Sequence, residues 1–216
     1  MTTDPRVCRS LAWGFHDPGG IVLWCLIQPT KHLHIIGELP FEQLDEQELA
    51  TAIKIRDTQL GIGPNGRLEI EHIAYTVGTP EIVSNPKQKK LGFRGETVGD
   101  RLLRFGIVVI AADEDVVNGW ARCQSLLRSD EAGRPWLTID PSCTHLIQAL
   151  PSGLQDAKDV DDILTPAPAL TALRFLAMSR PSPMLRSAAR VMPPGSPADI
   201  MRKMRRGQGR QFGEAR

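Results

Sequence analysis

Residues 10–24, SLAWGFHDPGGIVLW, contain two apolar runs separated by a turn, and the rest of the fold can be built outward from them. The runs 6–13 and 20–28 have the composition of strands, and the segment GFHDPGG between them has hairpin-like turn chemistry. A third apolar run, HLHIIGEL at 32–39, follows a break at residues 29–31. Three consecutive short strands predict an antiparallel meander.

Helical and strand-like segments alternate after this meander. Helical spacing is found at 45–62, where Asp45 is a plausible N-cap, at 95–106, where Gly106 ends the helix, and at 116–129, 142–154 and 168–180. In the helix at 142–154, Ser142 or Thr144 is expected near the cap, and Pro168 is expected in the first turn of the last helix. Apolar strands are expected at 68–78, 107–113 and 134–140. This order predicts an α/β fold with a mixed sheet, an antiparallel meander at its edge plus parallel strands, flanked by helices.

The bulk composition is that of a soluble globular protein. The chain has 216 residues, 41% of them hydrophobic and 24% charged. It has neither an apolar run long enough to span a bilayer nor a signal-peptide pattern at its start, which predicts an intracellular, cytoplasmic protein with no membrane partner. The four cysteines form no C-x-x-C pair, which favours buried, inert thiols over disulfides or a zinc site.

Two short motifs have a structural and a functional interpretation. His32 and His34 form an H-x-H that would place both imidazoles on one face of a strand, as two metal ligands would lie, but no further ligand is spaced nearby. We therefore expect half-exposed strand residues. The segment GIGPNG at 61–66 matches G-x-G-x-x-G, but it follows a helix and precedes a strand, whereas a dinucleotide fingerprint follows a strand. We expect a flexible loop there.

The charge is unevenly distributed along the chain. From Arg180 onward nine Lys and Arg residues face only Asp199 and Glu214, a net charge of +7, so the remainder of this +1 chain carries −6. We expect a folded domain at 1–180 and a basic, Pro- and Gly-containing, flexible tail at 181–216 that seeks a polyanion or an acidic protein surface. The expected binding residues of this tail are Arg202, Lys203, Arg205, Arg206 and Arg210.

Six segments, in order, resemble the C-terminal nuclease domain of tailed-phage terminase large subunits, which has a ribonuclease-H-like fold. LAWGFHDPGGIVLW is similar to the family's D-W-G-x-x-D-P strand and turn, LHIIGELPFEQLDEQELA to its third strand and first helix, and AYTVGTPEI to the strand that ends in Asp-Pro. RFGIVVIAADEDVVNGWARCQSLL resembles the strand that leads into an Asn-Gly-Trp helix. PWLTIDPSCTHLIQALPSGLQ resembles the next strand and its Cys-containing helix, and KDVDD with ALTALRFLAM resembles the terminal Asp-rich loop and D-A-L-R-Y helix. The resemblance covers residues 7–180.

The resemblance implies two-metal DNA cleavage, but the expected catalytic carboxylates are replaced. Such nucleases hold two Mg²⁺ or Mn²⁺ ions about 4 Å apart with clustered acids. At the matching positions this chain has Ala12, Thr79 and Thr171, and Pro168 stands where a histidine is common. Three different replacements favour natural loss of the catalytic centre over an engineered change. We therefore expect a pseudoenzyme that needs no cofactor.

The residual catalytic candidates are acids near these positions: Asp17, Glu38, Asp161 and Asp162. Asp17 has the alternative interpretation of a turn residue, and Asp161 and Asp162 that of a solvated acidic loop. If these acids formed a relocated site, the protein would be a Mg²⁺- or Mn²⁺-dependent endonuclease.

Three functions follow from these observations. The first is a catalytically inactive DNA-packaging protein that binds double-stranded DNA or a partner such as a terminase ATPase, a portal or an intact nuclease copy. The second is the endonuclease with relocated ligands. The third is a purely structural subunit of virion assembly that contacts protein alone. The first is favoured.

Overall fold

The computed structural model describes residues 5–14, 19–64, 66–68, 70, 73–83, 96–155 and 167–179, with the side chains of 152–155 excepted. All of these residues belong to the first of two compact units into which the chain divides, Met1–Pro183 and Met184–Arg216. The expected basic tail therefore lies outside the described residues. So do the end of the last expected helix, Arg180, and the acidic loop with Asp161 and Asp162.

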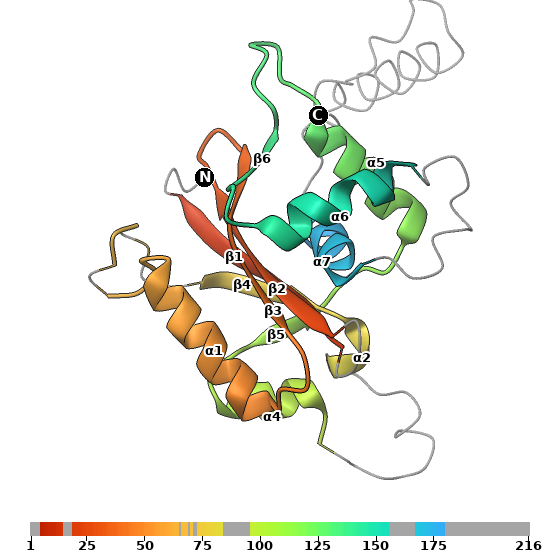
Figure 1. The fold of residues 1–216 in the computed structure, drawn as a ribbon. Coiled ribbons are helices and arrows are strands. Elements are labelled where there is room, and N and C mark those ends of the chain that lie inside the picture. Colours follow the sequence, from red (N-terminus) through yellow and green to blue (C-terminus); the bar gives the residue numbers. More distant parts are fainter. Residues whose placement is uncertain are drawn as a thin grey trace, which may run out of the picture. The chain divides into compact units, whose positions relative to one another are not determined.

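The core of the fold is a six-stranded mixed sheet with the order β5-β4-β1-β2-β3-β6 (Figure 1). Its strands are β1 (Arg6–Ala12), β2 (Gly20–Ile27), β3 (Leu33–Phe41), β4 (Ile73–Gly78), β5 (Val109–Ala111) and β6 (Leu137–Ile139). The first three form the expected antiparallel meander, with Ser10 opposite Leu23 and Leu23 opposite Glu38. β4 pairs with β1, β5 with β4 and β6 with β3, all in parallel, so the mixed sheet predicted from the sequence is confirmed.

The meander does not lie at an edge of the sheet, which corrects the sequence-based expectation. β6 pairs with β3 through Leu33–Leu137 and Ile35–Ile139, so a parallel strand covers each side of the meander. Only β2 runs against the other five strands. Sequence order alone could not decide this, because β6 returns from more than 90 residues downstream to reach β3.

Helices cover both faces of the sheet (Figure 1). On one face α1 (Glu46–Gln59), α2 (Pro80–Val83) and α4 (Val98–Arg104) pack on a buried cluster that includes Leu11, Trp24 and Leu49. On the other face α5 (Val116–Leu127), α6 (Thr144–Gln155) and α7 (Pro168–Met178) pack on a second cluster that includes Leu23 and Leu173. Successive residues of a strand point to opposite faces, so β1 contributes Val7, Arg9 and Leu11 to the first layer and Cys8, Ser10 and Ala12 to the second.

Local signals set several element ends as expected. Asp45 and Glu48 form a capping box at the start of α1, and Gly106, with φ +80°, follows α4. The GIGPNG segment is the connection between α1 and β4, and Gly61 and Gly63 both have positive φ there. Its interpretation as a loop is confirmed.

Other elements differ from the sequence-based expectation. β5 has only three residues of the apolar run 107–113, and β4 begins at Ile73 rather than at Leu68. The four-residue helix α2 was not predicted. His32 precedes β3 and is buried against Trp136, with the ring centroids 4.6 Å apart, so the expected half-exposed strand position is wrong for His32. His34 is half-buried on β3 and lies 2.8 Å from the hydroxyl of Thr138.

The cysteines are free and buried, as the sequence predicted. Burial raises the pKa of the Cys123 thiol to about 12 and that of Cys143 to about 11. Both thiols therefore stay protonated near neutral pH, where a thiol is a poor nucleophile. Within the described part of the chain, no helix combines the length and the apolar character that crossing a membrane requires.

Candidate functional site at the ends of β1 and β4

Two of the three replaced positions meet where β1 and β4 end. Ala12 is the last residue of β1, and Thr79 directly follows β4. The Thr79 N–H donates to the carbonyl of Leu11 at 3.1 Å, and the N–H of Trp13 donates to the Thr79 hydroxyl at 3.0 Å. The parallel pairing of the two strands brings their carboxyl ends to the same edge of the sheet. The Thr79 side chain therefore joins the two strand ends.

The last helix, α7, lies across this part of the sheet. The Ser10 hydroxyl donates to the carbonyl of Ala172 at 2.5 Å, and near the other end of the helix the hydroxyls of Tyr75 and Ser179 are 3.0 Å apart. Since Tyr75 lies at the entering end of β4, α7 runs against β1 and its first turn lies toward the strand ends. Ala12, Ala169 and Ala172 accordingly share one buried cluster.

Thr171 is half-buried on this helix, between Leu170 and Ala172. Its N–H donates to the carbonyl of Ala167, which is an ordinary helical bond of the first turn. The structure thus places Ala12 and Thr79 at neighbouring strand ends and carries Thr171 on the helix that packs beside Ala12. At these three positions the site offers a methyl group and two hydroxyls, and no carboxylate. Among the described residues, no group of three or more His, Cys, Asp or Glu side chains is arranged to hold a metal ion.

Glu38 has a structural partner set in this fold. It lies on β3, opposite Leu23 of β2, and is 7% exposed. One of its carboxylate oxygens accepts from the backbone N–H of His145 at 2.8 Å, and the other accepts from that of Leu146 at 3.0 Å. The His145 ring nitrogen Nδ1 lies 2.8 Å from the same carboxylate. Glu38 therefore satisfies the first turn of α6, the role that the sequence suggested for Ser142 or Thr144.

The remaining sequence-based candidates lie outside the described residues. They are Asp17 in the segment between β1 and β2, Asp161 and Asp162 before α7, and the tail residues Arg202, Lys203, Arg205, Arg206 and Arg210. Their assignments stay predictions.

Three acids that follow β5 were not predicted as site residues from the sequence. Asp113, Glu114 and Asp115 come after the third of three neighbouring parallel strands, so they leave the sheet at the same edge as Ala12 and Thr79. Asp115 caps α5 by accepting from the N–H of Asn118 at 2.9 Å, and this bond holds the pKa of its carboxyl below the ordinary value. The signal that could have found them is the rule that parallel strands end at one edge.

Arg174, in the TALRF segment, is buried in the same region. Its Nη1 donates to the carbonyl of Glu114 at 3.4 Å, and its guanidinium carbon lies 5.5 Å from the centre of the Phe175 ring. Gly119 of α5 makes room for it, since a Cβ at Gly119 would lie 2.4 Å from the Arg174 Cγ. The NGW and TALRF segments, 50 residues apart in sequence, are thus packed together through a glycine and an arginine.

Comparisons of this chain with protein-family models, with curated proteins and with solved structures found no match. Neither a family nor an activity is therefore assigned from relatives. What supports a function is the arrangement of the chain's own residues, together with the order of its strands and helices.

Proposed function

We propose that this protein is a catalytically inactive relative of the terminase nuclease domain, which acts in phage DNA packaging by binding double-stranded DNA. The order β3-β2-β1-β4-β5, with β2 alone reversed, is the order expected of a ribonuclease-H-like sheet. A last helix packed across β1 and β4 agrees with that fold. These features support two proposals, that the fold is ribonuclease-H-like and that the protein acts in packaging.

The observation that carries the proposal is the junction of Ala12, Trp13 and Thr79. Two-metal phosphodiester cleavage needs carboxylate oxygens that hold and bridge the ions. A methyl group at Ala12 offers no ligand, and the Thr79 hydroxyl already accepts from the Trp13 N–H. The junction joins the carboxyl ends of β1 and β4, where a nuclease of this class would carry its acids, and its side chains there are a methyl group and a hydroxyl. Without carboxylates at Ala12, Thr79 and Thr171, these positions repel DNA phosphates less than an intact carboxylate cluster would, so DNA binding can persist without cleavage.

The +7 charge of the tail is the second support for a DNA partner. Each phosphate that a Lys or Arg neutralises releases a condensed counterion, which gives sequence-independent affinity that falls with salt. In a DNA-binding role, the five clustered Lys and Arg residues from Arg202 to Arg210 contribute most of this salt-dependent affinity.

Fluorescence anisotropy of a labelled DNA duplex, titrated with the full chain at several salt concentrations, tests the proposal. Replacing Arg202, Lys203, Arg205, Arg206 and Arg210 by Gln is expected to reduce the slope of log affinity against log salt by about 4.5, since each neutralised phosphate contributes about 0.9 to the slope. The control variant carries Gln at Lys31, Arg67 and Arg128, which are exposed on the folded unit, and it should keep the original slope. Absence of DNA affinity at low salt would overturn the DNA role and leave a protein-only assembly subunit.

A plasmid-nicking assay with Mg²⁺ or Mn²⁺ tests the loss of catalysis. The proposal expects no nicking by the full chain at high protein concentration. Metal-dependent nicking that disappears when Asp161 and Asp162 are changed to Ala would contradict it and establish the endonuclease with relocated ligands.

A further inference from the structure

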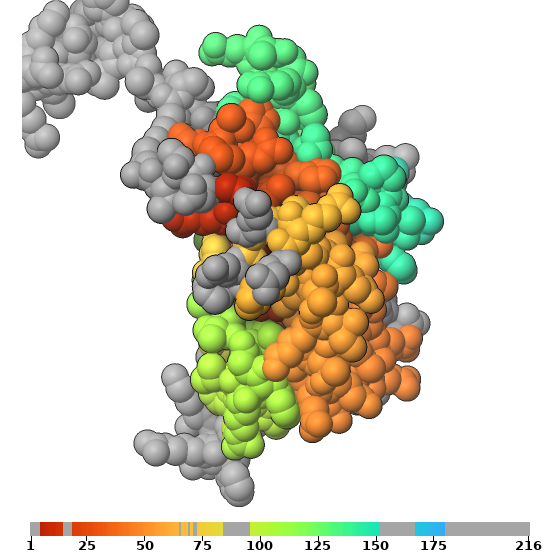
Figure 2. Space-filling view, turned by 90° about the vertical axis from the view of Figure 1, so that its left-hand side faces the viewer, coloured from red at the N-terminus to blue at the C-terminus, as the bar shows by residue number. Residues whose placement is uncertain are grey.

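A cleft with a volume of about 610 Å³ opens on the face of the sheet that carries α1 and α4, opposite the face covered by α7. Figure 2 shows this face, with α1 in orange and α4 in yellow-green. The cleft lies over β1 and β4, between α1 and the segment 106–110. Its volume is in the range of small-molecule sites, about 300–1,000 Å³.

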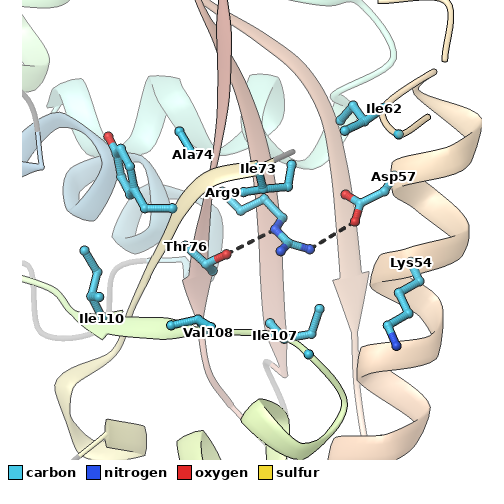
Figure 3. A pocket seen from close by; sticks show the side chains of 13 residues that line it. Arg9, Lys54, Asp57, Ile62, Ile73, Ala74, Thr76, Ile107, Val108 and Ile110 are labelled. Carbon is cyan, nitrogen blue, oxygen red and sulfur yellow. Dashed lines mark hydrogen bonds and ion pairs between the residues drawn. The ribbon is translucent and has the colours of Figure 1, made fainter. Parts of the chain in front are cut away.

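The base of the cleft is a buried polar network centred on Arg9, which is 5% exposed. The Arg9 Nε donates to the Thr76 hydroxyl at 3.1 Å, and Nη1 donates to Asp57 at 3.2 Å (Figure 3). The other oxygen of Asp57 accepts from the indole N–H of Trp24 at 2.6 Å. The guanidinium is therefore held in one orientation from two sides.

The Arg9 guanidinium has N–H donors that bond to no described residue. Of its three nitrogens, Nη2 bonds to no described residue, and Figure 3 shows it pointing toward the segment with Ile107 and Val108. Burial lowers the pKa of Arg9, against the opposing effect of Asp57, and burial also raises the pKa of Asp57. Both shifts reflect the cost of removing charge from water, and for Arg9 an acceptor in the cleft would reduce that cost.

The charges around the cleft favour a single negative charge. Arg9 and Asp57 form an ion pair, and Lys54 of α1 lines the same cleft. Among the described residues that line the cleft, one positive charge is thus left over. The walls are apolar, with Ile62, Ile73, Ile107, Val108 and Ile110 on their surface.

We propose that this cleft binds a small organic monoanion, a carboxylate on a compact apolar body, with the carboxylate on Arg9 Nη2 and the apolar body against the isoleucine and valine walls. Nη2, which bonds to no described residue, can donate a charge-assisted hydrogen bond to a carboxylate oxygen. The walls supply the affinity that a single exposed ion pair lacks. This site is on the opposite face of the sheet from the Ala12–Thr79 junction. The proposal of a carboxylate ligand therefore does not depend on the proposal of DNA binding.

Titration of ¹⁵N-labelled full-length protein with phenylacetate, followed by NMR, tests the proposal. Amide shifts are expected at Val108 and Ile110, with a dissociation constant about ten-fold lower than that of the neutral phenylacetamide, a difference of about 1.4 kcal/mol. Lys54→Gln, at an exposed position, should weaken phenylacetate a few-fold and leave phenylacetamide unchanged.

Two tryptophan variants provide a matched pair. Val108→Trp places an indole at the mouth of the cleft and should abolish binding, whereas Val117→Trp on α5 should not, and both positions are similarly exposed, at 59% and 61%. Three results would each overturn the proposal: equal affinity for acid and amide, equal effects of the two tryptophans, or no binding up to about 50 mM. Tighter binding of phenyl phosphate than of phenylacetate would overturn the assignment to a carboxylate.

Discussion

At individual residues of this protein, close packing against a neighbouring side chain can decide which residue type is tolerated. Gly119 shows this most directly, because it stands inside α5 although glycine weakens helices by about 1 kcal/mol relative to alanine. The helix tolerates that cost because the Arg174 stem occupies the space where a Cβ would stand, at 2.4 Å from Cγ and 2.7 Å from Cδ. Packing at this residue outweighs helix propensity.

Gly119→Ala should therefore lower the free energy of unfolding by about 1–3 kcal/mol, the range for overpacked cores, instead of raising it as propensity alone predicts. Chemical denaturation with a double-mutant cycle measures this. Arg174→Ala removes the colliding stem, so alanine at 119 should cost less in that background. Stabilisation by Gly119→Ala in the wild-type background would contradict this prediction. It would show that α5 and α7 move apart without cost to admit the added methyl group.

At the scale of elements, helices in this fold are attached to the sheet by polar contacts as well as by apolar packing. Glu38 of β3 accepts from two backbone N–H groups at the start of α6, and Ser10 of β1 donates to the middle of α7. Both side chains are buried, at 7% and 0% exposed. A buried carboxylate is stable only when its oxygens are paired, so Glu38 and α6 depend on each other.

Glu38→Ala is expected to lower the free energy of unfolding by about 1–3 kcal/mol, because it leaves the first-turn N–H groups of α6 without an acceptor. Hydrogen exchange should show the loss of protection concentrated in α6. Thr144→Ala, at the cap suggested by the sequence, serves as the control and should change stability by less than about 0.5 kcal/mol. The opposite ranking of the two variants would contradict the assignment of Glu38 as the cap of α6.

For the whole molecule, the balance of charge makes stability depend on pH. Among the described residues, four carboxyls have their pKa lowered by hydrogen bonds in the folded state: Asp100 by Thr97, Asp115 by Asn118, Asp130 by Arg134 and Asp140 by Ser142. A lowered folded-state pKa contributes stability above the unfolded pKa, which is lost as pH falls through the folded value. Asp57 has the opposite sign, because burial raises its pKa, so its contribution falls as pH rises.

The free energy of unfolding should therefore fall between about pH 6 and about pH 3, since four groups outweigh one. Urea denaturation at several pH values in this range measures the slope. Asp130→Asn should flatten the slope, because an amide at this position does not titrate. Asp57→Asn removes a contribution that strengthens toward low pH, so the decline of stability on acidification should become steeper. A slope unchanged by Asp130→Asn would contradict the assigned role of its hydrogen bonds to the loop at 132–134.

The sequence by itself determined the features whose signals lie within a few residues of one another. Asp45 and Glu48 mark the start of α1, Gly106 ends the α4 segment, and the three apolar runs at the N-terminus form a meander. The resemblance also pointed to Ala12 and Thr79, and the structure brings these two together. Each of these expectations depends on periodicity, on caps or on a motif.

Only the tertiary structure decided which distant groups became partners. Glu38 reaches α6 across 107 residues, Arg9 reaches Asp57 across 48, and Trp13 meets Thr79 across 66. A carboxylate, a guanidinium and a hydroxyl each have many possible partners, and their own positions in the sequence do not choose among them. The choice is made when the sheet pairs β1 with β4 and β3 with β6, because a polar group that is buried between the layers is stabilised by whichever acceptor or donor this pairing brings near it.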